Sequence, residues 1–175
     1  EGRVMGTFGF LLPHKGQIEL VEAFERLPGW DNLLMLCATR DGSKNMENKL
    51  TKLIEEKGLQ DRVNLMTDFL DDDVAVATLA KCDLLVFPYQ NTKESASGAV
   101  RMGVAAGVPI AVSPIPIFED IEGAIKLRGK KVEDIVATIS MTSKDELDRC
   151  RDSMIKLRDS TQWQNIAELI QERLK

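Results

Sequence analysis

Two loops of the sequence carry residue types that could together bind an anion and a hydroxyl-rich group. The stretch TKESASGAV, residues 92–100, joins an apolar segment to a run of small residues that is typical of a helix. Backbone amides at a helix start favour a negative group, and small side chains let a ligand approach them closely. Glu94 would instead accept hydrogen bonds from hydroxyl groups, which predicts a two-part ligand. A capped helix start with a solvated glutamate is the alternative. The loop residues concerned are Ser95, Ala96, Ser97 and Gly98, with Ser97 or Ser95 as the N-cap.

The other loop, PHKG at residues 13–16, supplies positive charge. Lys15 lies at the predicted start of a helix, where the helix dipole disfavours a cation. An anion held between Lys15 and the loop that contains Glu94 would explain this position, and an ordinary surface lysine is the alternative. His14 could donate a hydrogen bond to a ligand oxygen, or it could simply lie exposed in the loop.

The elements that must position these loops alternate between apolar runs and amphipathic stretches. The predicted strands are 4–12, 32–38, 62–66, 83–89, 108–112 and 124–127, and the predicted helices are 15–27, 48–59, 71–82, 97–106, 131–140, 143–158 and 161–174. This alternation predicts an α/β fold: a doubly wound, Rossmann-like parallel sheet of about six strands with helices on both faces. Ligands of such sheets bind beyond the carboxyl ends of the strands, where both loops are expected to lie.

Composition and charge limit the possible partners. The 175 residues are 43% hydrophobic and 29% charged, which is typical of one folded domain over residues 1–175. The net charge of −5 gives no attraction for nucleic acid, and no apolar run is long enough to cross a membrane. Three scattered cysteines and one histidine favour a reducing, cytoplasmic location and predict neither a metal site nor a catalytic triad. The acidic run DFLDDD, residues 68–73, could coordinate a cation, but acids are also common at a helix start.

Two familiar nucleotide motifs are absent, and a different combination is present. The sequence has no G-x-G-x-x-G after its first strand and no G-x-x-x-x-G-K-[ST], which argues against a dinucleotide dehydrogenase and a P-loop NTPase. Four segments occur in order instead: GFLLPHKGQIELVEAF, GLQDRVNLM, KCDLLVFPYQNTKESASGAVRMGVAAGVPIAVS and STQWQNIAELIQERL. Over nearly the whole chain, and most specifically in residues 83–113, they resemble the C-terminal, nucleotide-sugar-binding half of a family-4 retaining glycosyltransferase with the GT-B fold.

The resemblance implies a role for each matching residue. Lys15 and Gly16 match the family's K-G motif, whose lysine contacts the donor diphosphate. Glu94 matches the glutamate that binds donor-sugar hydroxyls, and residues 95–98 match the loop whose amides meet sugar and phosphate. Lys15 and Glu94 are therefore the expected catalytic residues, with His14 beside them. The implied activity is hexosyl transfer with retention from a UDP-, GDP- or ADP-linked sugar, without metal or cofactor, in polysaccharide or glycolipid assembly.

Two positions depart from the family's pattern. Met102 stands where the family has a second glutamate that binds the ribose, and Phe10 stands where it has an arginine that contacts phosphate. We hypothesise that Arg101, one turn into the helix, supplies the missing positive charge. The nucleotide base is expected in the loops after strands 32–38 and 62–66, near Thr39, Arg40, Thr67 and Phe69.

The resemblance also implies an N-terminal domain that binds the acceptor and makes any contact with a membrane. Because a GT-B active site lies between two domains, we expect this chain alone to bind the donor weakly and to transfer no sugar. Two alternatives stay open. One is a degenerate GT-B-like binding or scaffolding module, which Met102 and Phe10 favour, and the other is a GT-B sugar-nucleotide epimerase.

Overall fold

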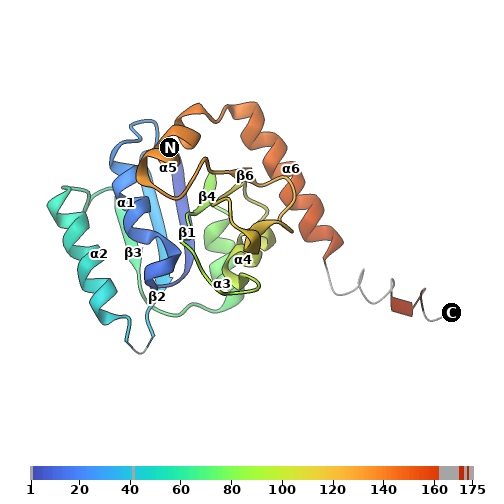
Figure 1. The fold of residues 1–175 in the computed structure, drawn as a ribbon, viewed down its shortest axis with the longest axis horizontal. Helices are drawn as coiled ribbons and strands as arrows, with labels where there is room; N and C mark the ends of the chain where they lie inside the picture. Colours follow the sequence, from blue (N-terminus) through green and yellow to red (C-terminus); the bar gives the residue numbers. More distant parts are fainter. Residues whose placement is uncertain (1, 41, 162–169, 172, 174–175) are drawn as a thin grey trace.

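The chain folds around one parallel β-sheet in the computed structural model, which describes residues 2–40, 42–161, 170–171 and 173 (Figure 1). Within these residues the sheet has six strands in the order β3-β2-β1-β4-β5-β6, and all neighbouring strands are parallel. The strands are β1 (Val4–Phe10), β2 (Asn32–Ala38), β3 (Val63–Met66), β4 (Leu84–Phe87), β5 (Ile110–Val112) and β6 (Ile125–Lys126). The predicted doubly wound α/β fold is confirmed.

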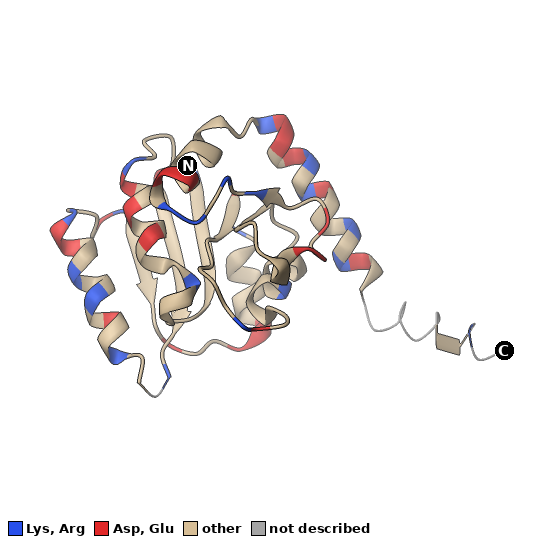
Figure 2. Cartoon of the chain, viewed as in Figure 1, with Lys and Arg blue, Asp and Glu red and all other residues tan. Residues whose placement is uncertain are grey.

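Helices cover both faces of the sheet. They are α1 (Gln17–Glu25), α2 (Lys44–Glu56), α3 (Asp72–Leu79), α4 (Gly98–Ala106), α5 (Val132–Met141) and α6 (Lys144–Ser160), with short 3-10 helices at Pro13–Lys15 and Pro116–Phe118. Helix α1 packs against α2 and α5, whereas α4 packs against α3 and α6, so that the sheet separates two helical layers (Figure 1). Figure 2 shows the charged residues gathered on the helices and loops, while β1 to β5 contain none.

The core lies between the sheet and the two helical layers. Strands β4 and β5 are buried along their whole length, as expected for parallel strands that are covered on both faces. Large side chains from other elements fill the adjoining space, among them Phe24 of α1 and Phe118 of the second 3-10 helix, both fully buried. This packing fixes the carboxyl ends of the strands, from which the two predicted site loops extend.

Within the described residues the predicted strands and helices are present, with shifted ends. The predicted helix 15–27 begins only at Gln17, because Gly16 adopts a left-handed conformation with φ 71° and separates α1 from the preceding 3-10 turn. The predicted helix 48–59 begins earlier, at Lys44. Most of the predicted helix 161–174 lies outside the described residues.

The order of the strands brings the two site loops together. Strand β1 lies between β2 and β4, so the chain reverses its direction of travel across the sheet at this point. The loops that follow β1 and β4 therefore leave neighbouring strands at the same edge, with a crevice between them. This is the switch point at which the sequence predicts a ligand.

Three further features bear on the predicted partners. Cys37, Cys82 and Cys150 are buried and free, and burial raises the pKa of Cys37 and of Cys82 to about 12, so both thiols are packing residues. Among the described residues, no helix has the length and apolar character that a membrane span requires. In the same part of the chain, no group of three or more His, Cys, Asp and Glu side chains is placed to hold a metal ion. Independence from metal stays a prediction.

Candidate functional site

Lys15 is held at the carboxyl edge of the sheet by the 3-10 turn that follows β1. Its side chain is only 9% exposed, and its ammonium group donates a hydrogen bond to Glu94 Oε2 at 2.8 Å. The same nitrogen lies 4.1 Å from the centroid of the Tyr89 ring, close enough for a cation–π interaction. Because two favourable contacts surround it, this nearly buried cation has a defined position.

The loop after β4 meets the 3-10 turn through its backbone. The amide of Gln90 donates to the carbonyl oxygen of His14 at 2.7 Å. At Gly16 the two loops are so close that an added Cβ would lie 2.0 Å from the carbonyl oxygen of Pro88. The sequence requires glycine here for two reasons: the positive φ and the close approach.

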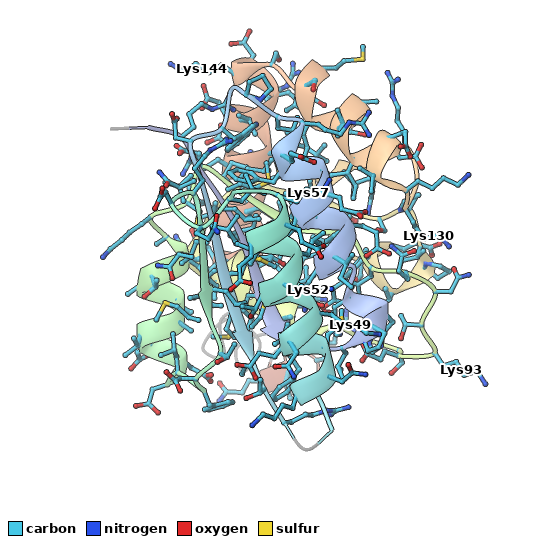
Figure 3. The ribbon with its side chains drawn as sticks, turned by 90° about the vertical axis from the view of Figure 1, so that its left-hand side faces the viewer. Lys49, Lys52, Lys57, Lys93, Lys130 and Lys144 are labelled. Carbon is cyan, nitrogen blue, oxygen red and sulfur yellow. The ribbon has the colours of Figure 1, made fainter. Side chains whose placement is uncertain are left out.

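Glu94 is the residue on which the two loops converge. Its Oε2 accepts from Lys15, and its Oε1 lies 3.0 Å from His14 Nε2, which donates to it. Its backbone amide donates to Thr92 Oγ1 at 3.1 Å, which fixes the main chain beside the carboxylate. The side chain is still 36% exposed. A ligand in the crevice can therefore reach a carboxylate whose orientation is already set. By contrast the neighbouring Lys93 points outward from the body of the fold (Figure 3).

The ionisation of Glu94 reflects opposing influences. Partial burial raises the pKa of the carboxyl, whereas the hydrogen bond and charge of Lys15, together with His14, lower it. The balance leaves the pKa below its ordinary value of 4.5. Glu94 is consequently a carboxylate, and a hydrogen-bond acceptor only, at neutral pH.

We expect the Glu94 contacts to lose their stabilising effect in acid. Because the pKa of Glu94 is lower in the folded than in the unfolded chain, its contribution is complete above about pH 4.5 and is lost as the pH falls through the folded-state pKa. Urea unfolding of wild type and Glu94→Gln from pH 7 to pH 3 measures this. The stability difference between the two proteins should shrink below pH 4.5, and a difference that stays constant to pH 3 would contradict the assignment.

The start of α4 forms the remaining side of the crevice. Ser97 is the N-cap, as predicted, and its Oγ accepts from the amide of Val100 at 3.4 Å. That hydroxyl also shares a hydrogen bond of 2.9 Å with the hydroxyl of Tyr89, and both side chains are buried. Tyr89 therefore connects the cap of α4 to Lys15. The other backbone amides of the first turn of α4 have small side chains around them and can donate hydrogen bonds to an anion.

A cavity of about 420 Å³ opens beside these groups. Glycine and alanine at the start of α4 form one wall, and the carboxyl ends of β1 and β2 with the segment that follows β3 form the others. The lining residues are Phe8, Gly9, Phe10, Leu12, Lys15, Leu36, Ala38, Arg40, Asp68, Phe69, Leu70, Asp72, Glu94, Ala96, Gly98, Ala99 and Met102. The volume is within the range of small-molecule sites, and the mixture of apolar walls with a few charged groups is typical of them.

The cavity contains many of the residues that the sequence singled out. Those predicted and found in its lining are Phe10, Lys15, Arg40, Phe69, Glu94, Ala96, Gly98 and Met102. Residues that sequence reasoning missed come chiefly from the carboxyl-terminal parts of β1 and β2, such as Phe8 and Leu36. Their position at strand ends was the available signal. Asp72 does lie in the first turn of α3, as the helix-start interpretation of the acidic run predicts, but it also lines the cavity.

Other predicted residues lie outside the cavity lining. His14 and Gly16 support it through Glu94 and Pro88, and Ser97 does so as the cap of α4, whereas Ser95 is simply exposed. Thr39 and Thr67 do not line it. The Thr39 hydroxyl donates to the Thr67 carbonyl oxygen at 3.4 Å, just beyond the ends of β2 and β3.

The structure does not bring Arg101 to the cavity. Its guanidinium instead forms an ion pair with Asp120, on the segment after the 3-10 helix Pro116–Phe118. Arg101 is therefore not placed to replace a missing positive charge, and this hypothesis is corrected.

Comparison with known proteins gives a family and a set of similar folds. Residues 1–156 match the family model described as "Glycosyl transferases group 1". No curated protein sequence matches the chain significantly. Among solved structures, HepE from Anabaena in complex with UDP and glucose aligns with a TM-score of 0.79 at 17% identity, over 98% of this chain and 48% of that one. Sucrose-phosphate synthase from Thermosynechococcus elongatus aligns with a TM-score of 0.78 at 16% identity, over 99% and 45%.

A third structure is a separate domain. The C-terminal domain of the group 1 family protein LpcC from Francisella tularensis aligns with a TM-score of 0.76 at 15% identity, over 91% of this chain and 85% of that one. The chain spans less than half the length of the first two structures. At these identities the likeness shows the fold.

Proposed function

Because the chain belongs to the glycosyl transferases group 1 family, we propose that it binds the nucleotide diphospho-sugar donor of a retaining, metal-independent hexosyltransferase. The observation that carries this proposal is the bond of Lys15 to Glu94 at the mouth of the cavity, beside the start of α4. An ammonium group and helix amides close to a carboxylate suit a ligand with phosphate and hydroxyl parts. The complex of HepE with UDP and glucose supports a donor of this class.

The roles of these groups follow from their chemistry. The amides at the start of α4 stabilise the diphosphate as negative charge builds up on it during departure, and the ammonium of Lys15, which shares its charge with Glu94, donates a hydrogen bond to it. Glu94 accepts hydrogen bonds from sugar hydroxyls and so orients the ring. In the transfer step the bond from the sugar carbon to phosphate oxygen breaks, and a bond to an acceptor hydroxyl oxygen forms on the same face. The proton of that hydroxyl passes to the departing phosphate.

We further propose that a second domain supplies the acceptor site and the other wall of the crevice, as in a two-domain GT-B enzyme. Such an enzyme would act in the cytoplasm, in the assembly of a polysaccharide or a glycolipid. On this proposal the present chain alone binds the donor weakly and transfers no sugar.

Titration of the chain with UDP, GDP and ADP, and then with the glucose-linked form of each, tests the donor proposal directly. Calorimetry or NMR should show binding of at least one nucleotide at high-micromolar to millimolar concentration, which corresponds to about 4–5 kcal/mol. Inorganic phosphate and the free nucleosides, titrated separately, give the contributions of the phosphate part and of the base and ribose part. Absence of binding by every nucleotide at millimolar concentration would contradict the proposal.

One observation favours a second candidate, a binding module without catalysis. Met102 and Phe10 line the cavity with apolar surface, so neither can hold a ribose hydroxyl or a phosphate. The two functions differ in what the full-length protein does. A module without catalysis releases no nucleoside diphosphate from any nucleotide sugar, whereas an epimerase would return an altered donor without transfer.

A further inference from the structure

The cavity offers a bound diphosphate few positively charged side chains. Of the described residues that line it, only Lys15 and Arg40 are cations. The charge of Lys15 is already matched by Glu94, to which its ammonium is bonded at 2.8 Å. Each phosphate of a nucleotide sugar carries a negative charge, so a diphosphate bound beside this neutral pair needs a further cation.

Arg40 has the position and the freedom to be that cation. It follows β2 by two residues, and its backbone is fixed: its amide donates to Ser43 Oγ at 2.8 Å, and the same hydroxyl donates back to the Arg40 carbonyl oxygen at 2.8 Å. Ser43 itself is buried at the start of α2. The guanidinium lies 5.6 Å from the centroid of the Phe10 ring, on the cavity side of β1. No described carboxylate forms an ion pair with it.

The order of the strands places Arg40 where the phosphates of a bound donor would lie. Along the carboxyl edge the sheet runs β3, β2, β1, β4, and the residues that follow these strands are Phe69, Arg40, Lys15 and Glu94 in turn. A nucleotide sugar has its diphosphate between base and sugar. With the sugar at Glu94 and the base toward the 74%-exposed Phe69, the diphosphate falls between them. The carboxylates of Asp68 and Asp72 disfavour phosphate at the β3 end.

We propose that Arg40 is a phosphate-binding residue of this site, and that its guanidinium supplies the charge which Lys15, paired with Glu94, does not. This inference rests on the proposed function. It assigns Arg40 to the diphosphate, whereas the sequence had placed Arg40 near the base. It also gives Arg40 the role of additional cation that the sequence had assigned to Arg101. A guanidinium is well suited to the task, because its planar group can donate two parallel hydrogen bonds to one phosphate.

The test compares ligands that differ only in their phosphates. The variant Arg40→Met keeps an apolar side chain over Phe10 while removing the charge, and it should lose about tenfold or more in affinity for the nucleoside diphosphate that binds wild type best. Its affinity for the corresponding nucleoside should change less than about twofold. Arg40→Lys should recover part of the loss, because it restores charge without the planar fork. The matched control is Arg149→Met on the exposed surface of α6, which should bind like wild type.

The outcomes separate this inference from the proposed function. If wild type binds a nucleoside diphosphate and Arg40→Met binds it equally well, the inference is wrong and the proposed function stands. If Arg40→Met loses affinity for nucleoside and nucleoside diphosphate alike, Arg40 acts on the base or on the fold, and the inference is again wrong. If wild type binds no nucleotide at all, the proposed function fails first. Thermal unfolding of each variant confirms that the comparison is made on folded protein.

Discussion

Replacing Gly16 with alanine is expected to destabilise the fold by about 2–3 kcal/mol. Two costs add at this position. Its φ of 71° is left-handed, which costs a residue with a Cβ about 1–2 kcal/mol. The new Cβ would also lie 2.0 Å from the backbone oxygen of Pro88, so the loops must separate and strain the bond from the Gln90 amide to the His14 carbonyl oxygen, worth about 1 kcal/mol. Urea unfolding at neutral pH measures the loss.

Gly58 provides a matched control for this prediction. It has a similar φ of 62°, but nothing lies within 4 Å of a Cβ placed there. Gly58→Ala should therefore cost only the conformational part, about 1–2 kcal/mol. Equal losses at the two sites would mean that the approach of the loops adds nothing. A greater loss at Gly16, accompanied by weaker nucleotide binding in the folded fraction, would show that the same contact holds Lys15 and Glu94 together.

The fold could be predicted from sequence because its signals are local. Apolar runs such as 32–38 and amphipathic stretches such as 15–27 alternate at spacings that only a parallel sheet with crossover helices accommodates. Element ends were less predictable. An apolar run continues past the last residue of a strand, so hydrophobicity alone does not show where the strand ends. Periodicity likewise predicts one helix over 15–27, whereas Gly16 separates a 3-10 turn from α1.

The sequence predicted many of the residues of the candidate site but not the contacts between them. Lys15 and Glu94 were expected to meet different parts of a ligand, yet in the structure they bond to each other, which the sequence could not show because 79 positions separate them. Arg101 was expected to face the ligand from its place in α4. Its partner Asp120 belongs to a segment after β5 whose path depends on tertiary packing. The role of Arg40 likewise depends on a neighbour, since Lys15 is neutralised only once Glu94 is in contact with it.

Replacing Glu94 with glutamine is expected to have opposite effects on two ligands. The amide keeps the size of the side chain but loses the negative charge, so sugar hydroxyls lose a charged acceptor and the affinity for a nucleotide sugar should fall about tenfold. The ammonium of Lys15 is no longer neutralised by its partner at 2.8 Å, so the affinity for the nucleoside diphosphate should hold or rise. In a protein that joins this chain to the proposed second domain, the release of nucleoside diphosphate during transfer should fall about 100-fold or more.

The opposite directions make this prediction difficult to satisfy by accident. A variant that merely weakens the fold lowers the affinity for both ligands. Only the loss of a group that contacts the sugar lowers the affinity for the nucleotide sugar without lowering the affinity for the nucleoside diphosphate. Glu55→Gln removes the same charge from an exposed position on α2 and should change neither affinity. If Glu94→Gln lowers the affinity for the nucleoside diphosphate as much as the affinity for the nucleotide sugar, Glu94 does not contact the sugar. Its part in the site is then confined to holding Lys15 and His14 in place. If the preference for the sugar-linked form disappears while the diphosphate binds more tightly, the carboxylate is the group that distinguishes the donor from its product.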